Sequence, residues 1–309
     1  MFPRKVGSAW EIFTPAKLNL YLEVLGPKSE GFHPLETLMT PVRIFDQIRW
    51  MPGSPGRLKP KLQICNLLAT SRGPAISLGP QPDNLVMRAA EKLARSAGVE
   101  HHGTFQLVKR IPVQAGLGGG SSDAAATLQL LNVAWNIHYD PSRLRQLAAE
   151  LGSDVPFFVG SGPAICRGRG EQIERVAGLP RLALVIVKPP VGLSTQQVFD
   201  RLHNDGLPSV DQQLPSAKRL ALLVSALRRG ALADAGQRIF NRLEAVAEQL
   251  TPWIVRLRQV FNQCGCHGHF MTGSGTAYAG VMRSAKQARL VARSLACRDL
   301  GSIFATSSC

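Results

Sequence analysis

A glycine-rich segment in the middle of the chain has residue types that suit phosphate binding. Four of the five residues at 116–120 are glycine, and Ser121, Ser122 and Asp123 follow before an alanine-rich run. Glycine lets backbone N–H groups approach a ligand closely, and a helix that begins here adds the partial positive charge of its N-terminus. The segment favours a phosphate cradle, with a plain glycine turn before a buried helix as the alternative.

The loop matches neither of two common phosphate-binding patterns. No Gly-Lys-Ser/Thr follows at Walker A spacing, and Gly-x-Gly-x-x-Gly does not occur in it. A lysine that acts on phosphate would therefore come from elsewhere. Taken alone, Lys17 is better explained as a solvated lysine and Asp154 as a turn-forming aspartate.

Composition and charge narrow the class of protein. The chain has 309 residues, of which 45% are hydrophobic and 18% charged, as in a globular chain of roughly two domains. We find no apolar run long enough to span a membrane and no apolar core of a secretion signal near the N-terminus. These features predict a cytoplasmic protein without a membrane partner.

The net charge of +15 favours anionic partners, or else a solvated basic surface. The charges are dispersed, without the blocks of like charge that mark a nucleic-acid-binding arm. A nucleic-acid-binding protein is the rival class, but no recognisable RNA-binding motif supports it. We therefore expect small-molecule partners and no nucleic acid.

The cysteines predict reduced thiols, because six in a chain of this length are sparse. Cys264, Cys266, His267 and His269 form a cluster of zinc-ligand types. A second pair at the usual spacing is missing, and Cys-x-Cys differs from the common Cys-x-x-Cys knuckle. The pattern favours an ordinary turn that leads into a strand.

Local patterns predict a mixture of helices and strands. Asp83 and Asn84 cap a helix at 85–97, and Asp140 with Pro141 begins another that runs to residue 151. Residues 10–25 and 35–50 each read as more than one strand, with a turn at 15–19 in the first stretch. Further helices are expected at 122–135, 216–229, 231–239, 241–262 and 284–296, and strands at 62–65, 105–109, 182–187, 269–272, 277–281 and 302–305. Because no regular βαβ rhythm appears, the fold class is α+β.

Three segments, taken together, resemble the ordered motifs of the GHMP small-molecule kinase superfamily. They are Thr14–Leu20, Pro112–Ser122 and Met271–Thr276. Nearly the whole chain is covered in motif order. Pro15–Leu20 followed by Gly31-Phe32-His33 is similar to the branch that acts on 4-diphosphocytidyl-2-C-methyl-D-erythritol.

The resemblance implies a GHMP kinase fold: an N-terminal domain like domain 2 of ribosomal protein S5 at 1–175, and a C-terminal ferredoxin-like α/β sandwich at 176–309. It implies ATP-dependent phosphorylation of the 2-hydroxyl of that cytidyl substrate, in non-mevalonate isoprenoid precursor biosynthesis, with Mg²⁺. Ser122, or water and the phosphates alone, would hold the metal. The protein would be a monomer or a weak homodimer. Another acceptor, such as homoserine or mevalonate, is the alternative.

The resemblance also implies roles for individual residues. Asp154 would act as base or orient the acceptor hydroxyl, and Lys17 would offset charge on the transferred phosphoryl group. His33 would form a hydrogen bond with the edge of the cytosine. The rings of Phe32 and Phe199 would stack on the two faces of the cytosine, although Phe199 also suits a core position. The other expected substrate contacts are Asn19 and Thr195.

For ATP, the resemblance implies a cradle of backbone amides together with flanking side chains. Asn84 and Lys109 would lie near the adenosine. The second glycine turn would lie near the phosphates, or would be a plain hairpin. The expected ATP-binding residues are Asn84, Lys109, Pro112, Val113, Gln114, Ala115, Gly116, Leu117, Gly118, Gly119, Gly120, Ser121, Ser122, Gly273, Ser274 and Gly275. Two departures from the family pattern are Phe32 in place of tyrosine, and Arg242 in place of aspartate after Asn241.

Overall fold

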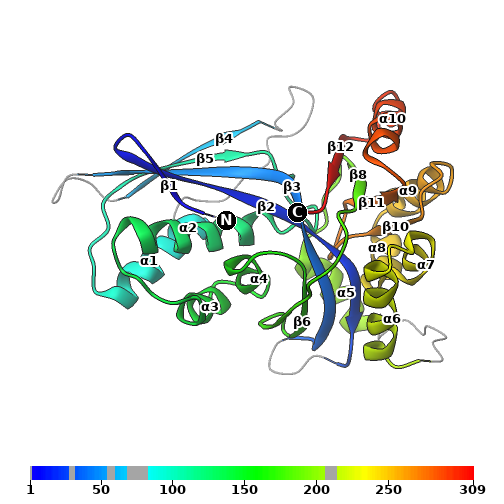
Figure 1. Ribbon diagram of the computed structural model, residues 1–309, viewed down its shortest axis with the longest axis horizontal. Coiled ribbons are helices and arrows are strands. Elements are labelled where there is room, and N and C mark those ends of the chain that lie inside the picture. Colours follow the sequence, from blue (N-terminus) through cyan, green and yellow to red (C-terminus); the bar gives the residue numbers. More distant parts are fainter. Residues whose placement is uncertain (1, 28–31, 54–59, 68–82, 206–213) are drawn as a thin grey trace. The chain divides into compact units, whose positions relative to one another are not determined.

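The computed structural model describes residues 2–27, 32–53, 60–67, 83–205 and 214–309, and its chain divides into two compact units (Figure 1). Unit 1 comprises Met1–Ala16, Ile44–Pro112 and Gly118–Ser161. Unit 2 comprises Lys17–Arg43, Val113–Leu117 and Gly162–Cys309. The units interleave along the chain, and the expected division at residue 175 stays a prediction.

Two long strands contribute residues to both units. Strand β2 runs over Ala9–Val24 and β3 over Leu35–Pro52. The predictions of a turn at 15–19 and of a strand pair at 35–50 were therefore wrong. Pro15 has no N–H to donate, yet β2 continues through it, and its carbonyl accepts a hydrogen bond from Ser122 Oγ at 2.6 Å.

In its described residues, unit 1 combines sheet strands with four helices. Its complete elements are β1 (Arg4–Val6), β4 (Lys61–Asn66), β5 (Gly103–Lys109), α1 (Leu85–Ala97), α2 (Gly119–Ala134), α3 (Pro141–Ala149) and α4 (Val155–Val159). The strand order is β1-β2-β3-β5-β4, and β4 runs parallel to β5. Helix α1 packs against α2, and both lie along one face of these strands (Figure 1). The predicted caps of α1 and α3 are confirmed: Asn84 accepts from Val86 N at 3.0 Å, and Asp140 accepts from Ser142 N at 2.7 Å.

Unit 2 contains a complete second sheet. Strands β8 (Ala183–Lys188), β10 (Gly268–Met271), β11 (Tyr278–Met282) and β12 (Ser302–Ser307) form it in the order β10-β11-β8-β12. All three pairings are antiparallel. In chain order these are strands 2-3-1-4, the arrangement of a ferredoxin-like sandwich. Together with unit 1, this confirms the α+β class.

The remaining elements in the described part of unit 2 are three short strands and six helices. The strands are β6 (Ala164–Gly168), β7 (Gln172–Arg175) and β9 (Phe240–Asn241). The helices are α5 (Thr195–Asp205), α6 (Ser216–Arg228), α7 (Leu232–Arg238), α8 (Leu243–Leu250), α9 (Pro252–Asn262) and α10 (Ala285–Ala296). Helix α10 packs on β8 and β12.

The predicted helix at 241–262 was wrong, because the structure forms two helices there. Pro252 cannot donate an intrahelical hydrogen bond and clashes with the preceding turn, so α8 ends at Leu250. Thr251 then caps α9 through its side-chain oxygen, and Pro252 occupies the first turn, where no donor is needed. Helices α4 and α5 were not predicted, because both follow short polar turns without a long periodic pattern.

Candidate active site

Three segments that are far apart in sequence meet within unit 2. The N–H of Lys17 donates to the Leu117 carbonyl at 2.9 Å, and the N–H of Ala277 donates to the Ala115 carbonyl at 3.1 Å. The first motif, the beginning of the glycine loop and the third motif are thus joined by backbone hydrogen bonds. The sequence predicted this convergence only through the family resemblance.

Glycine is required where the glycine loop touches the third motif. Gly116 has a φ of 73°, and a Cβ there would lie 2.1 Å from the Thr272 carbonyl oxygen. Gly273 has a φ of 57°, and a Cβ there would lie 2.9 Å from the Gly116 carbonyl oxygen. Any side chain at either position would force the two segments apart.

The Lys17 side chain is buried beside this contact. Its ammonium donates to Asn19 Oδ1. A Cβ on Gly273 would lie 3.1 Å from Lys17 Nζ, so the ammonium lies next to the glycine turn. Asn19 is itself held, since its N–H donates to Thr272 Oγ1 at 3.0 Å and its Nδ2 to Thr37 Oγ1 at 2.8 Å. The amide therefore orients the ammonium toward the third motif.

A further loop is attached to the same turn. Thr195 Oγ1 and Ser274 Oγ lie 2.9 Å apart, and Thr276 Oγ1 donates to the Val191 carbonyl at 2.7 Å. The buried ammonium of Lys188 donates to the carbonyls of Pro189 and Val191 at 2.7 and 2.8 Å. Burial lowers the pKa of Lys188 to about 8. Thr195 is thus brought to the third motif, as a substrate-binding role would need.

The aromatic residues predicted to bind cytosine also lie within unit 2. The rings of His33 and Phe199 stack with centroids 5.5 Å apart. His33 is 8% exposed, and its Nδ1 lies 3.1 Å from the Gly26 carbonyl oxygen. Within the described ranges its Nε2 is buried and has no hydrogen-bond partner. Since such atoms are rare, Nε2 is suited to a ligand's polar edge.

Phe32, the other predicted aromatic contact, is 44% exposed. The Arg169 guanidinium lies over its ring, 4.3 Å from the centroid. Cation–π contacts of this kind hold a ring in a fixed orientation. The structure shows His33 and Phe199 in mutual contact, and the sandwich of a cytosine between Phe32 and Phe199 stays a prediction. Gly31 lies outside the described residues.

Unit 1 contains the rest of the glycine loop, at the start of α2. Gly118 is the N-cap with a φ of 70°, and as a glycine it has no side chain to occupy the first amides of the helix. The Ser122 side chain is bound to strand β2, because its hydroxyl donates to the Pro15 carbonyl and also contacts Thr14 Oγ1. The first turn of α2 contains no acidic residue. This terminus therefore suits an anion.

Lys109 lies directly beneath this turn in a buried cluster of charges. A Cβ on Gly119 would lie 3.2 Å from Lys109 Nζ. The ammonium pairs with Asp46 and, at 2.6 Å, with Asp123 Oδ2. Asp46 Oδ1 also accepts from the N–H groups of Arg110 and Ile111 at 2.5 and 2.8 Å. The expected contact of Lys109 with adenosine stays a prediction, since its ammonium is held by two carboxylates.

The cluster has one positive and two negative groups, and this sets its protonation. Burial opposes the charge on Lys109, but the Asp123 and Asp46 carboxylates outweigh burial and raise its pKa. Burial, assisted by repulsion from Asp46, raises the pKa of Asp123 to about 7 despite the attraction of Lys109. Asp123 Oδ1 is also buried without a hydrogen-bond partner in the part of the chain described. The cluster thus holds one extra proton up to near neutrality.

Asp154 belongs to unit 1 and stands at the start of α4 as its N-cap residue. It is half-buried, and Pro156 lies within the first turn behind it. The helix that follows is apolar and fully buried, so the backbone at Asp154 is fixed. A rigid position suits a residue that must orient a hydroxyl group.

The first amides of α2 form the kind of backbone cradle that phosphate needs. No group of three or more His, Cys, Asp or Glu residues that could hold a metal occurs among the described residues. Ser122 remains a candidate for Mg²⁺, although its hydroxyl hydrogen is donated to Pro15.

The cysteines behave as the sequence predicted. None of the six, all of which lie in the described ranges, forms a disulfide. Cys264 and Cys266 donate to the carbonyls of Val260 and Phe261, and His269 contacts Tyr278 and Asn262. These residues form a turn and strand, as expected. In the ranges that the structure covers, no helix is both long and apolar enough to cross a membrane.

The sequence did not single out three buried residues that hold the site together. They are Asp46, Glu23 and Asn241. Asp46 was detectable as a carboxylate in an apolar strand. Arg242, the departure from the family pattern, pairs with Glu23 at 2.5 Å, and Arg219 does the same.

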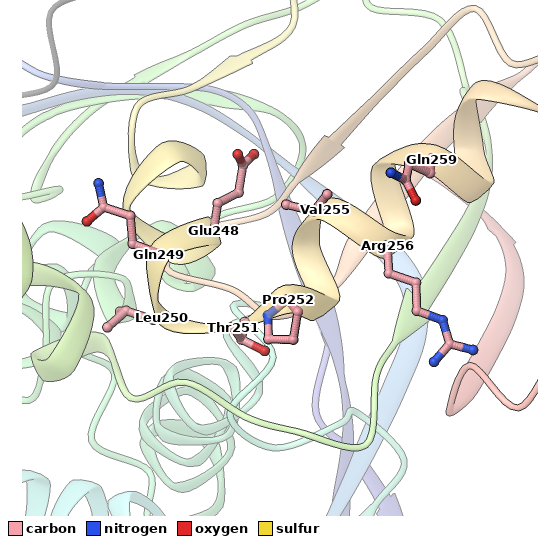
Figure 2. A pocket seen from close by; sticks show the side chains of 8 residues that line it. All are labelled: Glu248, Gln249, Leu250, Thr251, Pro252, Val255, Arg256 and Gln259. Carbon is pink, nitrogen blue, oxygen red and sulfur yellow. The ribbon is translucent and has the colours of Figure 1, made fainter.

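A hollow between α8 and α9, lined by residues such as Glu248, Thr251, Val255 and Arg256, contains none of the predicted site residues (Figure 2).

Two family models match this chain. Residues 84–162 match the GHMP kinases N terminal domain, and residues 223–300 match the GHMP kinases C terminal domain. A solved structure of mevalonate kinase from L. major with R-mevalonate superposes with a TM-score of 0.72 at 16% identity, covering 99% of this chain and 98% of that one. At that identity the likeness shows the fold alone. The chain is a GHMP kinase by fold and by family match.

The match to one branch of these kinases is much closer. A 4-diphosphocytidyl-2-C-methyl-D-erythritol kinase from Pelotomaculum thermopropionicum is 38% identical over 277 residues, which cover 90% of each protein. A crystal structure of 4-(cytidine 5'-diphospho)-2C-methyl-D-erythritol kinase superposes with a TM-score of 0.75 at 32% identity, covering 96% of this chain and 98% of that one. The chain belongs to the 4-diphosphocytidyl-2-C-methyl-D-erythritol kinase family, which confirms the resemblance.

Proposed function

We propose that this protein transfers the terminal phosphoryl group of ATP to the 2-hydroxyl of 4-diphosphocytidyl-2-C-methyl-D-erythritol. One observation carries the proposal: the glycine loop, the third motif and Asn19 all meet around the buried Lys17 ammonium. Phosphoryl transfer needs positioned charge more than covalent chemistry. The relatives named above support this acceptor rather than homoserine or mevalonate.

In this proposal each residue of the site has one task. The oxygen of the substrate's 2-hydroxyl attacks the terminal phosphorus. Asp154 accepts the proton of this hydroxyl, or orients the hydroxyl for the attack. Lys17 offsets the negative charge on the transferred group, and the bond from that phosphorus to the departing ADP breaks. Backbone amides of the glycine loop and of the start of α2 bind the phosphates. Mg²⁺ would neutralise phosphate charge, with Ser122, or water and the phosphates alone, as its ligands.

The cytidine end of the substrate is bound in unit 2. His33 Nε2 is the polar atom that faces the cytosine edge, since it is buried without a partner within the described part of the chain. Phe199 and Phe32 supply aromatic faces, and Thr195 and Asn19 supply polar contacts. Base recognition by stacking together with one polar edge is a selective arrangement. Asn84 would lie toward the adenosine of ATP, and Lys109 would support the start of α2, which binds the phosphates.

A coupled assay of ADP release tests the proposal directly. The purified chain is given ATP, Mg²⁺ and one of three acceptors: the cytidyl substrate, homoserine or mevalonate. We expect turnover with the cytidyl substrate alone. Turnover with homoserine or mevalonate in its place would reject the acceptor, and an Asp154→Ala variant with wild-type kcat would remove Asp154 from the mechanism.

A further inference from the structure

Asn241 is a buried residue to which neither the sequence nor the proposed mechanism assigns a task. It ends the short strand β9, directly before α8, and is 6% exposed. Its Nδ2 donates to two backbone carbonyls, those of Met271 and Gly273, at 2.8 Å each. Gly273 is the residue of the third motif that lies against both Gly116 and Lys17.

The surrounding donors and acceptors fix the orientation of this carboxamide. Asn241 Oδ1 accepts from the N–H of Leu243 at 3.0 Å, so the oxygen must face α8. The amide nitrogen must then face the two carbonyls, since only a donor can satisfy them. An aspartate would place a second acceptor against two acceptors. The site therefore needs asparagine and not merely a polar residue of that shape.

The same short segment holds the third motif from a second direction. Glu244 Oε2 accepts from the N–H of Met271 at 3.1 Å. Arg242 N donates to the Leu22 carbonyl at 2.9 Å, which ties the segment to β2, the strand that also contains Lys17. The third motif and strand β2 are thus both bound to this segment, and Asn241 Nδ2 donates to the carbonyl of Gly273 in the turn.

We propose that Asn241 is a positioning residue for phosphoryl transfer: its two hydrogen bonds hold the Gly273 turn in place against Lys17. This inference rests on the proposed function. Loss of the hydrogen bonds would let the turn move relative to the ammonium, and small misplacements of reacting groups are costly in rate. Substrate binding through His33 and Phe199 involves other residues and should be affected little.

The test is Asn241→Asp, with kcat and KM measured across pH with ATP and the cytidyl substrate. At pH of about 8 we expect kcat to fall about 10- to 100-fold, with KM for the cytidyl substrate within about twofold of wild type. A buried carboxyl facing two carbonyls has a raised pKa, and when protonated it regains one donor. The ratio of variant kcat to wild-type kcat should therefore rise as the pH is lowered to about 6.

Asn132→Asp is the matched control. Asn132 is also buried and also clamps a turn, since its Nδ2 donates to the Tyr139 carbonyl at 3.0 Å and its Oδ1 accepts from Tyr139 N at 2.9 Å. It lies near the C-terminal end of α2, outside the motifs. We expect a lower Tm for this variant, with a kcat ratio near one at every pH.

Three outcomes would overturn the inference. One is a folded Asn241→Asp protein with wild-type kcat, and another is a kcat ratio that does not change with pH. The third is the same loss of kcat in Asn132→Asp. If circular dichroism shows that Asn241→Asp is unfolded, Asn241→Ser, which keeps one donor without a buried charge, decides by its kcat in the same way. Failure of the proposed function is recognised separately, because wild type itself would then not phosphorylate the cytidyl substrate.

Discussion

Each unit buries a lysine whose ammonium lies beside a glycine of one of the motifs, but the two lysines have different neighbours. In unit 1, Lys109 Nζ lies between the Asp46 and Asp123 carboxylates. In unit 2, Lys17 Nζ donates to the neutral amide of Asn19. Two carboxylates hold the Lys109 ammonium in place, whereas the Asn19 amide orients the Lys17 ammonium.

The surroundings of each ammonium indicate its task more clearly than burial does. The Lys109 cluster also binds the backbone N–H groups of Arg110 and Ile111, and so fixes the chain where it enters the glycine loop. The Lys17 ammonium lies next to the Gly273 turn. We therefore infer that Lys109 supports the loop, while Lys17 acts on phosphate. The predictions below test this contrast.

The largest expected effect is on catalysis in Lys17→Met. This change keeps most of the side-chain volume and removes the charge. We expect kcat to fall about 100- to 1000-fold, because stabilisation of charge on the transferred group is lost, with the Tm close to that of wild type. Steady-state kinetics and thermal unfolding measure the two quantities. A kcat within threefold of wild type would contradict a catalytic role for Lys17.

Lys109→Met should reduce stability more than it reduces catalysis, the reverse of Lys17→Met. Removal of the ammonium leaves two buried carboxylates without their partner, and breaking a buried pair in this way costs about 3–5 kcal/mol of unfolding free energy. Urea unfolding measures this loss. The companion variant with Asp46→Asn and Asp123→Asn in addition should recover part of it, because no uncompensated charge then remains. If Lys109→Met instead kept wild-type stability and lost ATP affinity, the sequence-based role near adenosine would replace ours.

Much of the fold and the motif residues could be predicted from the sequence, because glycine loops, caps and periodic helices are local signals. Asn84 and Asp140 cap the helices as expected. The site residues that were missed act at long range. Asn241 contacts Gly273 and Asp46 contacts Lys109, over separations of 32 and 63 residues. Nothing local at Asn241 indicates two carbonyl acceptors, and nothing local at Lys109 indicates that two carboxylates surround it.

A smaller effect is expected at the cytidine end in His33→Ala. Loss of one hydrogen bond to the base should raise KM for the cytidyl substrate by about tenfold, or roughly 1.4 kcal/mol. KM for ATP should stay near its wild-type value, because the ring stacks on Phe199, which is outside the glycine loop. Initial rates at varied concentrations of each substrate measure both constants. Equal changes in the two would argue that His33 is structural.

A last effect concerns the pH dependence of stability, and it comes from the extra proton of the Lys109 cluster. Burial raises the pKa of Asp123 from its ordinary 3.8 to about 7 in the folded protein. Between these values the folded state holds more protons than the unfolded state, so this group's contribution to stability is fully present below pH of about 4 and is lost as the pH rises through about 7. Asp123→Asn cannot titrate, and its amide oxygen can still accept from Lys109. The unfolding free energy of wild type should therefore fall relative to that of Asp123→Asn between about pH 5 and pH 8. Urea unfolding measures the free energy of unfolding of both proteins at each pH. If the two free energies changed in parallel with pH, Asp123 would be ionised throughout, and Lys109 would compensate both carboxylates without an added proton.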